Sequence, residues 1–481
     1  MFFGFDISKE DKQNLIILFI VGLVLKLFAF SQIYLISNDG AFQYLPVARL
    51  FYEGKYLQAL SQPQLPVYPF FISLLTHVTG NPELSGQLIS IVFSLLTIIP
   101  LYFLASSLFG ALPAFWTGVF YLVNPLMLRT SVDVLKEGLV VFCFISSIYF
   151  SRRFLSEGRA KWFVWTIVFS LFGALARITV LSVLIALLVW LTFQNLRGRI
   201  KDHKIVSQHL WVPLLLIGIV LIFVIPGILG WEVLAGKKYY GVLKDMMANW
   251  PHLSDMGQKF VLALRQLIET TCAIPCALAF IGLGFRVKTR DFSTDERYLL
   301  FVMIPIVGSF LVRDSARYLL PAIFLLYLWA GFGFVKVRDL IDSKYTRHPR
   351  FNAVVVVTVV LLTIVPISLR PQRLHKIGRK EVGLLLQEQC PSPPLILTNI
   401  PRVAYYARGS YIRINDKTMP TKRIVQLGKD SKADYIVVEA KRGEVEVINY
   451  LASVEQEGII ALLLRYPYGK KGRVIYVYRL N

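Results

Sequence analysis

The chain has 481 residues, of which 55% are hydrophobic and only 17% charged, and its mean hydropathy is +0.57. This composition excludes an ordinary soluble enzyme and indicates a membrane protein. The formal net charge of +22 does not indicate a nucleic-acid partner, because the Lys and Arg residues are spread among the segments between apolar runs, where topology signals lie.

Apolar runs of about 20 residues, the length that crosses a ~30 Å hydrocarbon core, recur along the chain. The first run follows Lys9 and Lys12, as the apolar part of a signal peptide would. It is too long for one and has no small-residue cleavage motif, so we expect a retained anchor. The runs predict about eleven transmembrane helices, near residues 14–36, 84–106, 111–127, 134–150, 162–176, 178–195, 210–230, 261–285, 298–312, 318–335 and 352–369.

The stretch 162–195 determines the predicted topology. At ~51 Å as a helix it is too long for one crossing, and Arg177 at its middle predicts a hairpin with Arg177 at the turn. The predicted cytoplasmic loops then hold thirteen Lys and Arg, against six outside. These loops are 197–209, 286–297 and 336–350 inside, and 231–260 and 313–317 outside. The positive-inside rule therefore predicts a multi-pass protein of the inner or plasma membrane with a cytoplasmic N-terminus and an extracytoplasmic C-terminal domain.

Two domains are expected. Residues 1–370 would form the transmembrane domain, which includes a long first external loop at 37–83, and residues 371–481 a small soluble α/β domain. In this tail, strand-like and helix-like runs alternate. The strand-like runs are Leu395 to Thr398, Tyr435 to Glu439, Ile459 to Leu464 and Val474 to Tyr478, and the helix-like runs are Arg379 to Gln389 and Glu444 to Glu455.

The first external loop places an acid directly after the first span. The carboxylate of Asp39, at the membrane surface, is well placed to take a proton from a hydroxyl group. An equal alternative is that Asn38 or Asp39 only caps the helix that follows. Further along the loop, the element Pro63 to Pro69 stops regular helix and, taken alone, carries little functional information.

Basic residues recur on the predicted outer face, where the positive-inside rule expects few. Each one alone is explained as an anchor to the headgroups of membrane lipids. Together they suit a ligand with a phosphate group, because Arg offers a planar fork of donors and Lys a mobile charge. They are Arg129, Lys136, Arg177, Arg313 and Arg317.

Asp133 and Glu137, four residues apart, are expected to share one helical face beside Lys136. Pairing with Arg129 as structural glue is the favoured interpretation, and binding of acceptor hydroxyls or of a metal is the alternative. The six histidines are scattered without ligand-like spacing. The sequence therefore carries no metal signature and no certain cofactor, with a divalent metal left as an open alternative.

Four motifs occur in an order that resembles a known family. They are Asp39-Gly40 with Tyr44, Leu65-Pro66-Val67-Tyr68-Pro69, the segment Ser131 to Glu137, and Arg317-Tyr318-Leu319-Leu320-Pro321-Ala322. Over about residues 10 to 370, the chain resembles the polytopic glycosyltransferases of the glycosyltransferase C fold. The similarity is strongest to the protein O-mannosyltransferase and aminoarabinose-lipid A transferase branch, including bacterial relatives that are dolichyl-phosphate-mannose-protein mannosyltransferase-like.

This resemblance implies inverting transfer of a sugar from a polyprenyl-phosphate-linked donor to a hydroxyl group of a glycan, lipid or protein, on the extracytoplasmic face. Asp39 matches the family's base. The residues that would bind the lipid phosphate are Arg129, Lys136, Arg177 and Arg317, with Tyr44, Tyr68 and Glu137 in support. The chain departs from the family at Gly40, where protein O-mannosyltransferases have Glu. The resemblance therefore does not imply a role for a second acid here, nor that the acceptor is a protein.

Two other classes of function compete with this one. A flippase or transporter of lipid-linked saccharide would place ionisable residues within its spans, as Lys26 and Glu269 are here. Replacing these two residues by apolar ones should cost an enzyme little. A noncatalytic envelope scaffold would use the C-terminal domain to bind a partner, but it leaves the ordered motifs unexplained.

Overall fold

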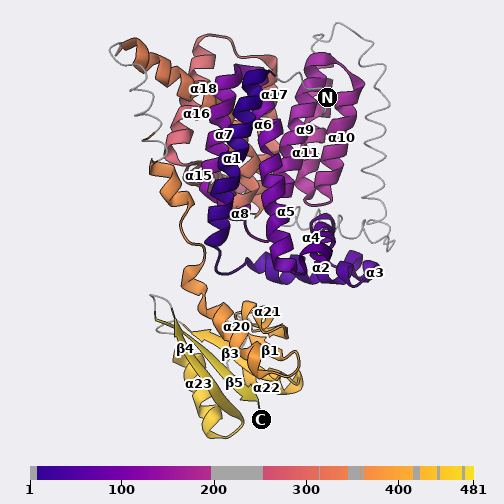
Figure 1. The fold of residues 1–481 in the computed structure, drawn as a ribbon, viewed down its shortest axis with the longest axis vertical. Coiled ribbons are helices and arrows are strands. Elements are labelled where there is room, and N and C mark those ends of the chain that lie inside the picture. Colours follow the sequence, from indigo (N-terminus) through magenta and orange to yellow (C-terminus); the bar gives the residue numbers. More distant parts are fainter. Residues whose placement is uncertain are drawn as a thin grey trace. The chain divides into compact units, whose positions relative to one another are not determined.

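The computed structural model describes residues 8–196, 253–313, 315–344, 358, 362–414, 423–440, 445–468 and 472–480. The chain divides into two compact units (Figure 1). The first comprises Met1–Ser31 and Tyr44–Arg370, and the second comprises Gln32–Gln43 and Pro371–Asn481. The short segment 32–43 therefore groups with the C-terminal domain, although it directly follows the first predicted span.

The first unit is helical. Figure 1 shows its long helices side by side, with the short α2 and α3 lying across their ends. Its helices are α1 (Lys9–Ser31), α2 (Leu45–Tyr52), α3 (Tyr56–Ser61), α4 (Val67–Thr79), α5 (Pro82–Leu96), α6 (Ile98–Phe109), α7 (Ala111–Val123), α8 (Pro125–Thr130), α9 (Glu137–Glu157), α10 (Ala160–Ala174), α11 (Leu181–Leu196), α15 (Leu253–Thr271), α16 (Ala273–Lys288), α17 (Thr294–Arg313) and α18 (Leu320–Lys344).

Membrane-length helices confirm the predicted polytopic α-helical class. Four helical stretches in the described ranges are long and apolar enough to cross a bilayer, or five if a bent pair counts as one span. The four are Lys9–Ser31, Pro82–Phe109, Glu137–Glu157 and Ala316–Ser343. The expected total of eleven stays a prediction, because the run 210–230 and half of 352–369 lie outside the described residues.

Two predicted features of the helices have different outcomes. The stretch 162–195 divides as expected, with α10 ending at Ala174 and Arg177 standing before η2 (Ile178–Val180) and α11. The span expected at 261–285 is interrupted, and its single crossing of the membrane stays a prediction. It is broken at Cys272, whose φ is 68°, and α15 and α16 meet there at 108°. A non-glycine residue in this left-handed region ends a regular helix.

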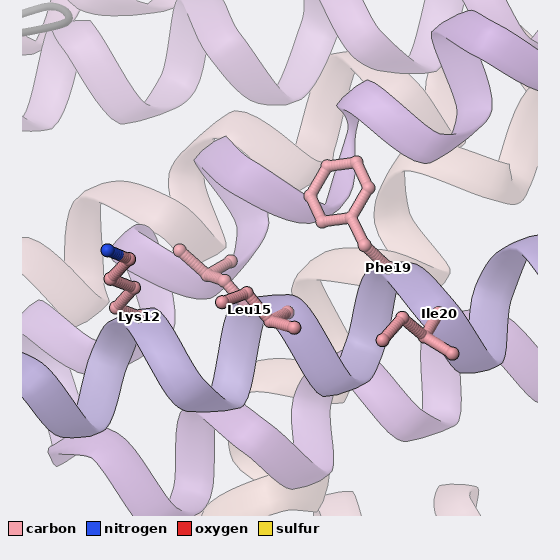
Figure 2. A pocket seen from close by; sticks show the side chains of 5 residues that line it. Lys12, Leu15, Phe19 and Ile20 are labelled. Atoms are coloured by element: carbon pink, nitrogen blue, oxygen red, sulfur yellow. The ribbon is translucent and has the colours of Figure 1, made fainter.

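The outer side of α1 is apolar and exposed, as a lipid-facing helix requires. Figure 2 shows Lys12, Leu15, Phe19 and Ile20 around a shallow depression on this helix. Ile20 is 59% exposed, whereas Lys26 on the same helix is buried. Because only α1 side chains line the depression and all but Lys12 are apolar, it fits an acyl chain better than a reaction site.

The second unit is built on a five-stranded sheet with the order β2-β1-β3-β5-β4. The strand β1 pairs in parallel with β2 and β3, while β5 runs antiparallel to β3 and β4. Helices α20 and α21 pack on one face, and α22 and α23 pack on the other. The strands are β1 (Leu395–Thr398), β2 (Ser410–Arg413), β3 (Tyr435–Ala440), β4 (Ile460–Tyr468) and β5 (Arg473–Leu480), and the helices are η4 (Leu374–Lys376), α20 (Gly378–Gln389), α21 (Arg402–Tyr406), α22 (Arg423–Asp430) and α23 (Val445–Gln456).

This arrangement confirms the predicted small α/β domain, including four of its strands. The elements that sequence reasoning missed are β2, α21 and α22. Strand β2 lies at the edge of the sheet with mostly exposed side chains, and α21 is only five residues long. Neither therefore has the apolar periodicity by which strands and helices are recognised.

Candidate active site

The start of α9 is held in place by several neighbouring elements. A Cβ atom on Gly138 would lie 2.6 Å from the carbonyl oxygen of Ser90 on α5, so only glycine permits this approach. The Ser90 hydroxyl donates to the Leu135 carbonyl at 2.8 Å. Lys26 on α1 donates to the Ser131 hydroxyl at 2.8 Å. These contacts fix both ends of the turn that leads into α9.

Glu137, the first residue of α9, is paired with two arginines from distant parts of the chain. Its side chain is 1% exposed, and its Oε1 accepts a hydrogen bond from Arg177 at 2.7 Å. Arg317, from η3 (Ala316–Leu319) just before α18, lies 3.4 Å from the same oxygen. A buried carboxylate is tolerated only when it is paired in this way. The pairing joins α9, the turn between α10 and α11, and the start of α18.

The same cluster contains aromatic rings and a third cation. The Arg177 guanidinium lies 4.7 Å from the ring centroid of Tyr318, and the Lys136 ammonium lies 5.8 Å from that of Tyr44. The rings of Tyr44 and Tyr68 pack edge to face at 5.1 Å. The hydroxyl of Tyr68 donates to the Gly86 carbonyl at 3.0 Å, which fixes its ring. We call Tyr44, Lys136, Glu137, Arg177 and Arg317 the Glu137 cluster.

The Glu137 cluster has more positive than negative charge. It contains three cations and one carboxylate, and the nearby Asp133 is buried with its Oδ1 accepting the Val134 N–H at 2.8 Å. Burial alone would lower the pKa of Arg177, but nearby groups, chiefly Glu137, raise it, so the guanidinium stays charged. Arg317 remains 34% exposed. Cationic donors of this kind can hold the oxygens of a phosphate group.

One oxygen of Glu137 remains available. Within the described part of the chain, no group donates a hydrogen bond to its Oε2, although this atom is buried. A buried acceptor without a donor is unfavourable, so a bound molecule with a hydroxyl group would gain from donating to it. The Glu137 cluster therefore offers both cations and an acceptor.

The structure corrects the expected pairing of Glu137 with Arg129, because Glu137 pairs with Arg177 and Arg317. Asp133 lies in a turn before α9 rather than on the same helical face as Glu137. Arg129, on α8, donates to the Ile367 carbonyl at 3.0 Å instead of pairing with Glu137. The three-dimensional approach of Arg177 and Arg317, 40 and 180 positions away from Glu137, decides the pairing.

Asp39 belongs to the second unit and stands half-buried immediately before η1 (Gly40–Tyr44). The hydrogen bond that caps this turn is accepted by Ser37, whose hydroxyl oxygen receives the Gly40 N–H at 3.0 Å. The neighbouring Asn38 accepts a hydrogen bond from Arg402. Ser37, rather than Asn38 or Asp39, therefore accepts the hydrogen bond that caps this turn.

Some contributing residues escaped sequence reasoning. The contact between Arg402 and Asn38 joins positions 364 residues apart, and no local pattern marks it. Lys26, an ionisable residue within a predicted span of the kind that transporters use, instead donates to Ser131 and so holds the turn before α9. Glu269, the other such charge, is exposed and paired with Arg265 on α15. Within the described ranges, no group of three or more His, Cys, Asp or Glu residues could hold a metal ion.

The described residues thus comprise membrane-length helices, a buried acid paired with arginines, and a small α/β domain. Comparison with solved structures shows the glycosyltransferase C fold. ArnT from Cupriavidus metallidurans in its apo state matches with a TM-score of 0.59 at 15% identity, over 96% of this chain and 97% of that one. The fold resemblance found in the sequence is therefore confirmed.

Further comparisons agree. Residues 61–229 match the family model described as dolichyl-phosphate-mannose-protein mannosyltransferase. ArnT bound to undecaprenyl phosphate matches with a TM-score of 0.56, at 15% identity over 96% of this chain and 97% of that one. The archaeal oligosaccharyltransferase AglB from Archaeoglobus fulgidus, in complex with an inhibitory peptide and a dolichol-phosphate, matches with a TM-score of 0.58, at 12% identity over 98% and 74% of the two chains. No curated protein sequence matches the chain.

Proposed function

We propose that this protein is an integral membrane glycosyltransferase. It transfers a sugar from a polyprenyl-phosphate-linked donor to a hydroxyl acceptor on the extracytoplasmic face of the membrane. The observation that carries the proposal is the Glu137 cluster, in which Arg177, Arg317 and Lys136 outnumber the carboxylate they surround. The proposal is supported by two similar structures, which contain undecaprenyl phosphate and a dolichol-phosphate.

The cations of the Glu137 cluster are assigned to the donor's phosphate. As the bond between the anomeric carbon and the phosphate oxygen breaks, its electron pair moves to that oxygen. Arg317, which is partly exposed, and Arg177 then stabilise the negative charge that develops on the leaving phosphate. Because phosphate is already a good leaving group, no second carboxylic acid is required to protonate it, in contrast to the glycosidases.

Asp39 is assigned as the base. The acceptor hydroxyl oxygen attacks the anomeric carbon from the face opposite the phosphate, so its configuration inverts, and the hydroxyl proton moves to the Asp39 carboxylate. Tyr44 lies beneath Lys136 and packs on Tyr68, and Oε2 of Glu137 is assigned to a substrate hydroxyl group. Arg129, which donates to a backbone carbonyl, remains a further candidate for the lipid phosphate.

The test is transfer by the purified full chain supplied with a panel of polyprenyl-phosphate sugars and hydroxyl acceptors. We expect Asp39→Asn, which keeps the shape of the side chain but not its basicity, to lower kcat by 10²–10⁴-fold, the usual contribution of a general base. The matched control is Glu53→Gln, because Glu53 is another acid of the first loop and pairs only at the surface with Arg49 and Lys55.

Two outcomes would contradict the proposal. Asp39→Asn that transfers sugar at the wild-type rate would remove Asp39 as the base. A folded wild-type chain that neither hydrolyses nor transfers any sugar of the panel, but moves a labelled lipid-linked saccharide across vesicle membranes, would replace the enzyme by a transporter.

A further inference from the structure

The segment 32–43 is attached to the C-terminal domain by backbone contacts. Ile33 forms a parallel bridge with Gln372, and the N–H of Gln372 donates to the carbonyl of Gln32 at 3.1 Å. The guanidinium of Arg373 donates to the Leu35 carbonyl at 2.9 Å. This anchoring precedes Asp39 in the chain, and it explains why the segment groups with residues 371–481.

Side chains of the C-terminal domain contact the segment on both sides of Asp39. On α21, Arg402 donates from Nε to the side-chain oxygen of Asn38. On the same helix, the hydroxyl oxygen of Tyr406 accepts the N–H of Ile36 at 3.3 Å. Beyond Asp39, the ring of Phe42 packs edge to face on Tyr411 of β2, with 4.8 Å between the ring centroids.

The burial of these groups shows that the contact is part of the fold. Leu35 and Ile36 are fully buried, and Arg402 is only 6% exposed. A guanidinium loses solvation when it is buried, and the hydrogen bond from the Arg402 Nε to Asn38 offsets part of that loss. Two other arginines of the domain pair with Glu439, whereas Arg402 reaches the residue next to Asp39.

We propose that the C-terminal domain positions the base, and that Arg402 is a positioning residue which holds Asn38 and thereby orients Asp39. This inference rests on the proposed function of Asp39. It assigns the small α/β domain a role in the reaction itself rather than in binding an envelope partner. A displacement of about 1 Å in a reacting group can lower the rate by about 10²-fold, so loss of this contact affects turnover.

The test compares substitutions at both ends of the contact in the full-length protein. We expect Asn38→Ala and Arg402→Ala to lower kcat by about 10- to 100-fold with little change in the KM for a polyprenyl-phosphate sugar. Asn38→Asp keeps the oxygen acceptor and should retain most of the activity. Hydrogen exchange of residues 32–43 should speed up in the alanine variants and not in Asn38→Asp.

A matched control is Arg413→Ala, because Arg413 is an exposed arginine on β2 of the same domain. It should leave both kcat and the exchange of residues 32–43 unchanged. Should Arg402→Ala fail to fold, Asn38→Ala decides, since Asn38 is exposed and its loss leaves no cavity.

Failure of this inference is distinguishable from failure of the proposed function. If Asp39→Asn is inactive but Asn38→Ala and Arg402→Ala keep wild-type kcat and wild-type exchange, the positioning role is overturned and the base remains. If Asp39→Asn is fully active, the base is overturned, and the exchange measurement alone then shows whether the domain holds the segment.

Discussion

At the scale of single residues, the carboxylate of Glu137 carries most of the argument for a phosphate site. It is buried, and two arginines from other segments approach the same oxygen atom. Such a pair adds little stability compared with a well-packed apolar replacement, but removing one partner alone leaves a buried charge uncompensated. The arrangement is therefore explained better by a ligand that needs fixed cations than by stability.

Glu137→Ala should lower the free energy of unfolding by about 3–5 kcal/mol, because Arg177 would remain buried without its partner. The double variant Glu137→Ala/Arg177→Met should recover part of this loss while remaining inactive. Chemical unfolding of the detergent-solubilised protein measures the first effect and sugar transfer the second. Equal stability of Glu137→Ala and the wild type would show that the pair is not buried as described.

Lys26 changes the comparison between enzyme and transporter. The sequence suggested that an enzyme would tolerate its replacement by an apolar residue. In the structure it donates to Ser94 on α5 and to Ser131 in the turn before α9. An enzyme that relies on the position of Glu137 also needs this lysine, so loss of activity on its replacement does not favour a transporter.

At the scale of elements, the position of the reaction site depends on how closely α9 approaches α5. The absence of a side chain at Gly138 lets the backbone of α9 meet the Ser90 carbonyl, as small residues do at contacts between membrane helices. This contact places Glu137 where Arg177 and Arg317 reach it.

Gly138→Ala should therefore reduce both stability and transfer, because its Cβ atom would lie 2.6 Å from the backbone oxygen of Ser90. The matched control is Gly284→Ala on α16, where a Cβ atom meets nothing within 4 Å. The control should gain about 0.5–1 kcal/mol in stability, since alanine is the better helix former. Unfolding and transfer assays of the two variants check this, and equal effects at the two glycines would contradict the close approach.

At the scale of the whole molecule, the positive-inside rule predicts that the loop between α16 and α17 is cytoplasmic and that the C-terminal domain is extracytoplasmic. One compact unit contains both residues 32–43 and residues 371–481. This agrees with the prediction, because each of the two segments follows a predicted span that ends on the outer side. It also means that deleting the C-terminal domain would remove the partner of the Asp39 segment. Such a deletion therefore does not separate an enzyme from a scaffold.

Labelling with a membrane-impermeant maleimide tests the orientation. In a chain whose native cysteines are replaced, Ser453→Cys on α23 should react in sealed right-side-out vesicles. Thr289→Cys, at the end of α16, should react only after the vesicles are permeabilised. Both side chains are exposed, so a difference reflects the side of the membrane. The reverse pattern would place the C-terminal domain in the cytoplasm and overturn the topology.

The sequence by itself determined the membrane class, the hairpin at Arg177 and most strands of the C-terminal domain, because apolar length and periodicity are local properties of the chain. It also determined the resemblance to the glycosyltransferase C fold, through short motifs at the ends of predicted spans. Only the tertiary structure decided which arginines pair with Glu137, that α15 and α16 break at Cys272, and that Arg402 holds the residue beside Asp39. The pairings of Glu137 and of Arg402 are contacts between residues far apart in sequence, and the break at Cys272 is a single backbone conformation. No local sequence pattern therefore predicts any of these three features.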